Sequence, residues 1–236
     1  MKPGQKFRNA LKNNKPLIIP GTINAYSAKL AELANHNSIY LSGSGVAAAS
    51  YGLPDLGVTT LEDVLIDAKR ITSATSLPLL VDIDTGWGDF DAISNTIIEM
   101  GNANVAAVHI EDQIFDKRCG HRPNKQLVSI DEMQDRLKAA LDAKIDDSFF
   151  IMARTDALAS EGIEKAIERC GKYLDVGADG IFFEAVVSIE EYKEFKNNFS
   201  APLLANITEF GKTPLFTLEE LRSAKVSLAL YPLSAF

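Results

Sequence analysis

Cysteine is scarce in this chain of 236 residues, which has only Cys119 and Cys170. Two cysteines cannot build the disulfide framework of a small secreted domain, and such usage is typical of a reducing compartment. The first 14 residues are polar and basic, and they lack the apolar core of a secretory signal. We therefore expect a cytoplasmic protein.

Long apolar runs and excess positive charge are also missing. No stretch of about 18 apolar residues occurs, so no transmembrane helix is predicted. The 24 Lys and Arg residues are outnumbered by 32 Asp and Glu residues, which gives a formal net charge of −8. These features predict no membrane partner and no nucleic-acid partner.

What the chain does contain is 46% hydrophobic residues, arranged in eight short runs separated by amphipathic segments. The runs are Leu17–Gly21, Ser38–Gly43, Leu79–Asp84, Ala106–Asp112, Phe149–Asp156, Gly180–Ala185, Leu203–Thr208 and Ser227–Leu233. The amphipathic segments include Leu61–Thr72, Asp91–Met100, Ser129–Ala143, Gly162–Val176 and Ile189–Phe199. The runs do not alternate polar and apolar residues, as is typical of parallel strands buried on both faces.

Strand and helix alternating in this way predict an α/β fold, a (β/α)8 TIM barrel. An open doubly wound sheet is the alternative, but no GxGxxG motif follows the first strand. No linker divides the chain, so residues 1–236 are expected to form one domain. Only three residues follow the eighth strand, so the eighth helix and C-terminal segment of a complete barrel are absent. We expect the natural polypeptide to continue beyond Phe236.

Acidic residues mark the ends of two predicted strands. Asp82 and Asp84 are two apart, so their side chains share a face at the end of the third strand. Carboxylates that converge at a barrel mouth repel one another unless a cation separates them, and hard oxygen ligands suit Mg²⁺ or Mn²⁺. Glu111, at the end of the fourth strand, is a further candidate ligand. The alternative is that these are solvated acids.

Other polar residues also stand at the predicted strand ends, and the catalytic groups of a TIM barrel lie at the carboxyl ends of its strands. Arg154 can clamp a carboxylate with two hydrogen bonds. The candidates at these strand ends are Tyr40, Ser42, Gly43, Ser44, Arg154, Glu184, Asn206 and Thr208. Each one alone could be a cap or a salt bridge, but polar groups at so many strand ends favour a site.

The most distinctive segment is the basic run Lys117–Lys125, which holds Cys119, Gly120 and His121. Gly120 and Pro123 predict a loop. Positive charge stabilises a thiolate, so we expect a thiol that exchanges protons easily. A solvated basic loop with an incidental thiol is the alternative interpretation.

Several motifs together resemble the isocitrate lyase and phosphoenolpyruvate mutase superfamily. They are Gly21-Thr22-Ile23-Asn24-Ala25, Tyr40-Leu41-Ser42-Gly43, Gly52-Leu53-Pro54-Asp55-Leu56-Gly57, Pro78-Leu79-Leu80-Val81-Asp82, His109-Ile110-Glu111-Asp112-Gln113, the Lys117–Lys125 loop, Ile151-Met152-Ala153-Arg154-Thr155-Asp156-Ala157 and Leu204-Ala205-Asn206-Ile207-Thr208-Glu209-Phe210-Gly211. The likeness runs from about Gly4 to Phe236. Lys-Arg-Cys-Gly-His is typical of the lyases, and its continuation resembles the methylisocitrate lyase branch.

The resemblance implies a carbon–carbon lyase of propionate catabolism (the methylcitrate cycle). Such an enzyme cleaves a hydroxy tricarboxylate, (2-methyl)isocitrate, to pyruvate and succinate. It implies Mg²⁺, with Mn²⁺ possible, near Asp82 and Asp84, with Glu111 and Asp55 joining through water. The loop Gln113–Lys125 would close over the substrate.

The resemblance also implies roles for the remaining residues. Cys119 would protonate the succinate half, and Tyr40 is a candidate for taking the hydroxyl proton. Ser42, Gly43, Ser44 and Arg154 would hold the pyruvate half. Gly120, His121, Asn206, Ile207 and Thr208 would hold the succinate half near Glu184. A homotetramer that exchanges C-terminal helices is expected of the full-length protein.

The chain departs from the usual pattern of this family at three places, and two alternative functions remain open. Ser44 stands where relatives usually have Gly, Phe183 where they have Pro, and the family continues past Phe236. Another superfamily chemistry, acting on isocitrate, dimethylmalate, oxaloacetate or a phosphonate, is one alternative. A truncated, non-catalytic barrel that binds dicarboxylates is the other.

Overall fold

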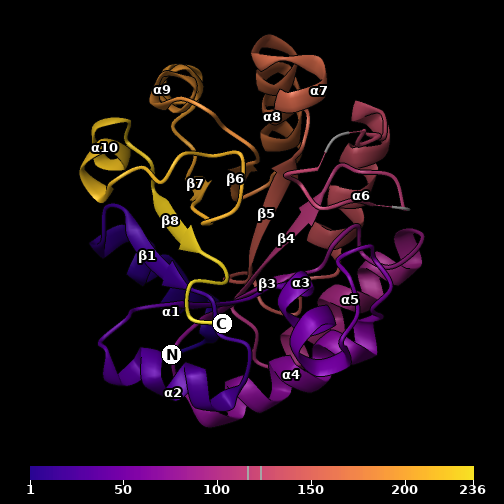
Figure 1. Cartoon of the computed structure of the whole chain (residues 1–236). Helices are drawn as coiled ribbons and strands as arrows, with labels where there is room; N and C mark the ends of the chain where they lie inside the picture. Colours follow the sequence, from indigo (N-terminus) through magenta and orange to yellow (C-terminus); the bar gives the residue numbers. More distant parts are fainter. Residues whose placement is uncertain (116, 123) are drawn as a thin grey trace.

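The computed structural model describes residues 1–115, 117–122 and 124–236, and these form a barrel of eight parallel strands surrounded by helices (Figure 1). The strands are β1 (Leu17–Pro20), β2 (Ile39–Leu41), β3 (Leu79–Asp82), β4 (Ala107–Glu111), β5 (Phe150–Thr155), β6 (Gly180–Phe183), β7 (Leu203–Asn206) and β8 (Leu228–Tyr231). Their order is β1-β8-β7-β6-β5-β4-β3-β2, and a parallel bridge between Gly21 and Tyr40 brings the two ends of the sheet together. The predicted TIM barrel is confirmed.

Both faces of the sheet are buried, which explains why the strands do not alternate in polarity. One hydrophobic cluster fills the barrel interior and includes Ile19, Leu80, Met152 and Leu228. A larger cluster lies between the sheet and the helices. Successive residues of a strand therefore enter two different cores, and each run needs apolar side chains throughout.

The surrounding helices are α1 (Pro3–Asn13), α2 (Ala25–Leu33), α3 (Gly43–Val46), the π-helix η1 (Ala47–Tyr51), α4 (Leu61–Ala74), α5 (Phe90–Asn102), α6 (Ile130–Asp142), α7 (Leu158–Glu161), α8 (Ile163–Val176), α9 (Ile189–Asn198) and α10 (Leu218–Ser223). Thr60 begins α4 with a reciprocal capping box to Asp63. Serine caps begin α6 and α9. These caps satisfy the amide groups that the first helical turn leaves unpaired.

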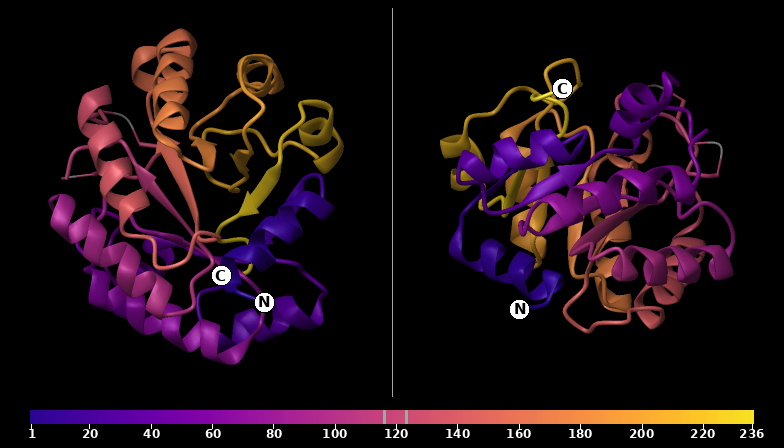
Figure 2. Two further views of the ribbon diagram at one scale, coloured as in Figure 1. Left: turned by 180° about the vertical axis from the view of Figure 1, so that it is seen from behind. Right: turned by 90° about the horizontal axis from the view of Figure 1, so that it is seen from below.

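Helix α1 has no counterpart among the predicted segments. Its Phe7 is fully buried and packs against Phe150, with 5.2 Å between the ring centroids, so α1 closes the end of the barrel where the strands begin. Figure 2 (right) shows the two termini at opposite ends of the barrel. Among the described residues, no helix follows β8. None of the helices in the described part of the chain has the length and apolarity needed to cross a bilayer.

Candidate active site

A cavity of about 120 Å³ lies where the strands end, and it gathers most of the predicted site residues. Its lining is Tyr40, Ser42, Ser44, Asp55, Asp82, Lys117, Cys119, Gly120, His121, Arg154, Phe182, Glu184, Asn206, Thr208, Pro232 and Leu233. Parallel strands bring their carboxyl ends to one edge of the barrel, so residues from distant parts of the sequence meet there.

A lysine from the basic loop lies among the acids predicted to hold a metal. The ammonium of Lys117 is 2.5 Å from Asp55 Oδ1 and 2.7 Å from Asp84 Oδ1. Burial raises the pKa of Asp84 to about 6, although Lys117 opposes the shift. Asp82 accepts the amide hydrogen of Gly43 at 3.3 Å. Within the described ranges, no three His, Cys, Asp or Glu side chains are arranged as a metal site, and the ammonium of Lys117 lies among the acids.

The acids nevertheless have the chemistry of a divalent-cation site. Glu111 is fully buried, and neither of its carboxylate oxygens has a hydrogen-bond partner among the described residues. Nε of Arg154 lies 3.3 Å from its Oε2, and burial raises the pKa of Glu111 well above its usual range. Buried oxygens without partners are costly, and four carboxylates in one place offer the hard ligands that Mg²⁺ prefers.

Arg154 is held rigidly at the end of β5. Its Nε donates to Asp156 Oδ2 at 2.9 Å, and the guanidinium carbon lies 5.0 Å from the centroid of the Phe182 ring. Lys125 also binds Asp156, at 2.8 Å, and donates to the carbonyl of Gly120 at 2.6 Å. Burial opposes ionisation, but Arg154 and Lys125 hold the pKa of Asp156 at about 2. Asp156 therefore joins the arginine clamp to the end of the basic loop, a role that the sequence analysis missed.

The prediction of a thiol with a lowered pKa is wrong for this structure. Cys119 lines the cavity and is half-buried, and burial raises its pKa. The loop cations cannot reverse this effect, because the ammonium groups of Lys117 and Lys125 are directed at carboxylates. The thiol therefore keeps its proton at neutral pH.

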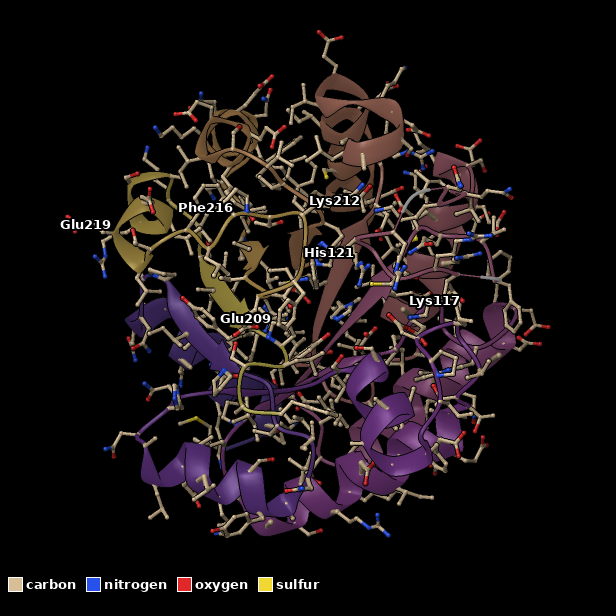
Figure 3. The ribbon with its side chains drawn as sticks, viewed as in Figure 1. Lys117, His121, Glu209, Lys212, Phe216 and Glu219 are labelled. Carbon is tan, nitrogen blue, oxygen red and sulfur yellow. The ribbon has the colours of Figure 1, made fainter. Side chains whose placement is uncertain are left out.

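His121 contacts residues from three other parts of the chain, and its tautomer is defined by one of these contacts. Its Nδ1 accepts the backbone amide hydrogen of Lys212 at 3.1 Å, so the ring proton lies on Nε2. Nε2 is 3.1 Å from Glu184 Oε1, a close contact with the carboxylate whose geometry is not that of a hydrogen bond. Asn206 donates to the other oxygen of Glu184 at 3.2 Å. Figure 3 shows His121 and Lys117 at the barrel mouth.

Gly120 is required by close packing next to His121. A Cβ at this position would lie 2.4 Å from Nη2 of Arg154 and 2.7 Å from Cγ of Glu184. Any larger residue would push the loop away from the arginine and so away from the cavity.

Tyr40 and His109 form a buried pair beside the acids. Tyr40 Oη is 3.0 Å from His109 Nε2, and His109 Nδ1 is 3.7 Å from Asp82 Oδ1. Burial, and then the charge of Asp82, raise the pKa of Tyr40 well above its usual range, whereas burial lowers the pKa of His109 to about 4. Tyr40 is therefore no resting tyrosinate. His109 was not among the predicted site residues, although its place two residues before Glu111 in the same strand was the available signal.

Two of the predicted substrate-binding residues, Gly43 and Ile207, have backbone amides that already donate hydrogen bonds within the protein. The amide of Gly43 already donates to Asp82. Ile207 lies outside the cavity, because its side chain is buried in the outer core and its amide donates to the carbonyl of Leu230. Ser42 and Ser44 do line the cavity, with 3.0 Å between their hydroxyl oxygens. Pro123, which helped to predict the loop, lies outside the described residues.

Comparison with known proteins gives one consistent result. The family model described as phosphoenolpyruvate phosphomutase matches residues 7–236. A 2-methylisocitrate lyase of Shewanella oneidensis is 60% identical over 233 residues, covering 99% of this chain and 80% of the relative. The 2-methylisocitrate lyase of Escherichia coli is 58% identical over 236 residues, covering 99% and 79%.

Solved structures agree with this family. A crystal structure of 2,3-dimethylmalate lyase superposes with a TM-score of 0.94 at 34% identity, covering 100% of this chain and 80% of that one. Phosphonopyruvate hydrolase, in a complex with oxalate and Mg²⁺, superposes with a TM-score of 0.85 at 30% identity, covering 98% and 80%. The chain belongs to the phosphoenolpyruvate mutase/isocitrate lyase superfamily and, within it, to the carbon–carbon lyases of the 2-methylisocitrate lyase family.

Proposed function

We propose that the cavity cleaves 2-methylisocitrate to pyruvate and succinate, with Cys119 as the acid. The observation that carries this proposal is the arrangement of one cavity. A protonated thiol and the His121–Glu184–Asn206 cluster line the same cavity as Asp55, Asp82 and Lys117, while Asp84 and Glu111 lie near Lys117 outside the lining.

The reaction needs one proton removed and one proton supplied. The hydroxyl on C3 loses its proton, the C2–C3 bond breaks, and C3 becomes the ketone carbon of pyruvate. The electron pair of the broken bond remains on C2 beside a carboxylate, and protonation there gives succinate. The proton that the substrate hydroxyl released then reprotonates the thiolate of Cys119, so no proton is gained or lost over the cycle.

Cys119 suits the role of acid because its burial keeps the thiol protonated. An acid that has to donate to a carbanion must carry its proton when the substrate arrives. The neighbouring Nε2–H of His121 and the amide of Asn206 offer donors to a substrate carboxylate, in competition with Glu184. Arg154 lines the same cavity and is a candidate for binding a second carboxylate.

Asp82 and Asp84, together with Asp55 and Glu111, are the residues that would hold Mg²⁺ or Mn²⁺. A bound divalent cation would polarise the hydroxy-carboxylate end of the substrate as a Lewis acid. Lys117 would give up its contacts with Asp55 and Asp84 when the cation enters, since it neutralises the same carboxylates. Oxalate and Mg²⁺ bound to phosphonopyruvate hydrolase, a relative of the same fold, support this assignment.

Tyr40 is the group that we assign to receive the hydroxyl proton. A resting tyrosinate is disfavoured, so Tyr40 can accept only while it passes its own proton to His109 Nε2, 3.0 Å away. The imidazolium formed in this way would face Asp82, which stabilises it.

The proposal is tested by measuring pyruvate release with 2-methylisocitrate and with isocitrate under the same Mg²⁺ concentration. We expect kcat/KM to be higher for 2-methylisocitrate. Turnover of 2,3-dimethylmalate or oxaloacetate alone would assign a different chemistry to the cavity. Binding of pyruvate and succinate without turnover of any of these substrates would indicate a non-catalytic barrel.

We propose further that the protein acts in the cytoplasm as a homo-oligomer, a tetramer by resemblance. Exposed apolar side chains support an assembly: Tyr26, Leu30 and Leu33 lie one helical turn apart along α2 and are 73%, 48% and 77% exposed. Such a stripe is typical of a helix face that packs against another chain or segment.

A further inference from the structure

A second and larger cavity, of about 600 Å³, opens at the other end of the barrel. It is lined by Leu11, Lys15, Lys196, Phe199, Ser200, Pro202, Arg222, Lys225, Val226 and Ser227. Pro202 and Ser227 directly precede β7 and β8, so this cavity lies where the strands begin, opposite the candidate active site.

The charge of this second cavity is one-sided. Four of its lining residues are basic, namely Lys15, Lys196, Arg222 and Lys225, and none is acidic. None of the four forms an ion pair with any described residue. These unpaired bases lie in a chain whose formal net charge is −8. Like charges gathered without partners repel one another, which favours a bound anion.

Two of the cations are held in place by backbone carbonyls, which do not neutralise them. Lys196 donates to the carbonyls of Ser200 and Ala201, at 3.2 and 2.8 Å. Arg222 Nε donates to the carbonyl of Lys15 at 3.1 Å, which ties α10 to the segment before β1. Burial, and then the charge of Lys225, lower the pKa of Lys196. The cavity therefore keeps its positive charge close together before any ligand binds.

The remaining lining is apolar and restricts the kind of anion. Leu11, Phe199, Pro202 and Val226 give the cavity an apolar wall beside the cations. Its volume lies in the usual range for small-molecule sites, roughly 300–1,000 Å³. Lys and Arg side chains are typical ligands of phosphate groups.

We infer that this cavity is a binding site for a small polyanionic phosphate ester with an apolar or planar body, the chemistry of a nucleoside polyphosphate. The site does not depend on the proposed catalytic function, because it shares no lining residue with the cavity at the other end of the barrel.

The test is calorimetric titration with adenosine triphosphate at low ionic strength and without divalent metal, with adenosine and inorganic pyrophosphate as separate probes. The chain is compared with the double variant Lys196→Gln/Lys225→Gln. The matched control is Lys12→Gln/Lys193→Gln, which removes the same charge from α1 and α9 at residues outside the cavity lining. Circular dichroism checks the fold of each variant, and Lys15→Gln/Lys225→Gln, which alters only exposed side chains, is a second test pair.

We expect adenosine triphosphate to bind more tightly than pyrophosphate and adenosine to bind least. The cavity variants should lose about tenfold or more in affinity, while the control keeps its affinity within about twofold. Equal weakening in the cavity and control variants would mean attraction by surface charge alone and would overturn the site. Unchanged affinity in the cavity variants, or no binding to the unmodified chain, would overturn it as well.

Discussion

At the scale of single residues, the chemistry of the candidate active site depends on which carboxylate each cation contacts. The loop brings its positive charges to the cavity, but Lys117 and Lys125 are directed at Asp84 and Asp156. The thiol of Cys119 is half-buried, and this burial favours its protonated form. A basic sequence context alone would give the opposite expectation.

The first prediction is that Cys119→Ser lowers kcat for cleavage by about 10²-fold or more, the usual scale for loss of an acid–base group. Substrate affinity should change little, because the serine has a similar volume. Because burial raises the pKa of Cys119, the rate of the unmodified chain should fall only as pH rises above the usual thiol range. A steady-state pH profile of both forms measures this, and near-normal turnover by the serine variant would show that the thiol is incidental.

The second prediction concerns Lys117 and the divalent cation. Lys117→Met removes the ammonium between Asp55 and Asp84, so Mg²⁺ should bind on the order of tenfold more tightly in the absence of substrate. Calorimetric titration with MgCl₂ measures the affinity. Arg118→Met changes the same charge on the same loop at an exposed side chain and should leave the affinity nearly unchanged. Equal affinities of Lys117→Met and the unmodified chain would contradict competition between the ammonium and the metal.

At the scale of elements, β4 and β5 form a rigid pair that positions the loop. Asp112, after β4, accepts hydrogen bonds from the hydroxyl of Thr155 at 2.7 Å and from the amide of Asp156 at 2.9 Å. Tyr173, on α8, donates to the same carboxylate at 2.9 Å. These hydrogen bonds to Asp112 hold the end of β5 in place. Asp156 in turn accepts hydrogen bonds from Arg154 and from the loop residue Lys125.

The third prediction is that Asp156→Asn destabilises the fold and that the loss depends on pH. The folded-state pKa of about 2 lies below the ordinary value of about 3.9, so the stabilisation is complete above pH 4 and disappears as pH falls from about 4 to 2. The shift corresponds to roughly 2–3 kcal/mol in the free energy of unfolding at neutral pH. Urea unfolding of both forms at pH 7 and pH 3 measures it. A difference between the two forms that does not shrink toward acid pH would disprove the ionic role of Asp156.

At the scale of the whole molecule, the barrel separates two cavities of different charge. The cavity at the ends of the strands mixes acids and bases around the thiol, and the cavity at their beginnings is lined by bases without acids. The exposed stripe of Tyr26, Leu30 and Leu33 lies on the outer helix α2.

The fourth prediction is that this stripe takes part in assembly. Light scattering after size-exclusion chromatography should show a homo-oligomer, and the double variant Leu30→Glu/Leu33→Glu should shift it toward smaller species. Charged side chains on a buried helix face oppose association. Tyr51→Glu changes another exposed apolar residue, outside α2, and serves as the control. A monomer of the unmodified chain at micromolar concentration would refute the proposal.

The sequence by itself determined the strands, because runs buried on both faces must be apolar throughout, and it determined the strand-end residues that the barrel brings together. It also identified the family through Cys119-Gly120-His121 and the acidic motifs. It did not determine which charges meet. Lys117 contacts Asp55 across 62 positions of sequence, and His121 contacts the amide of Lys212 across 91. The burial and the neighbouring charges that set the protonation of Cys119, Tyr40 and His109 come from residues distant in sequence, and therefore only the tertiary structure decided these protonation states.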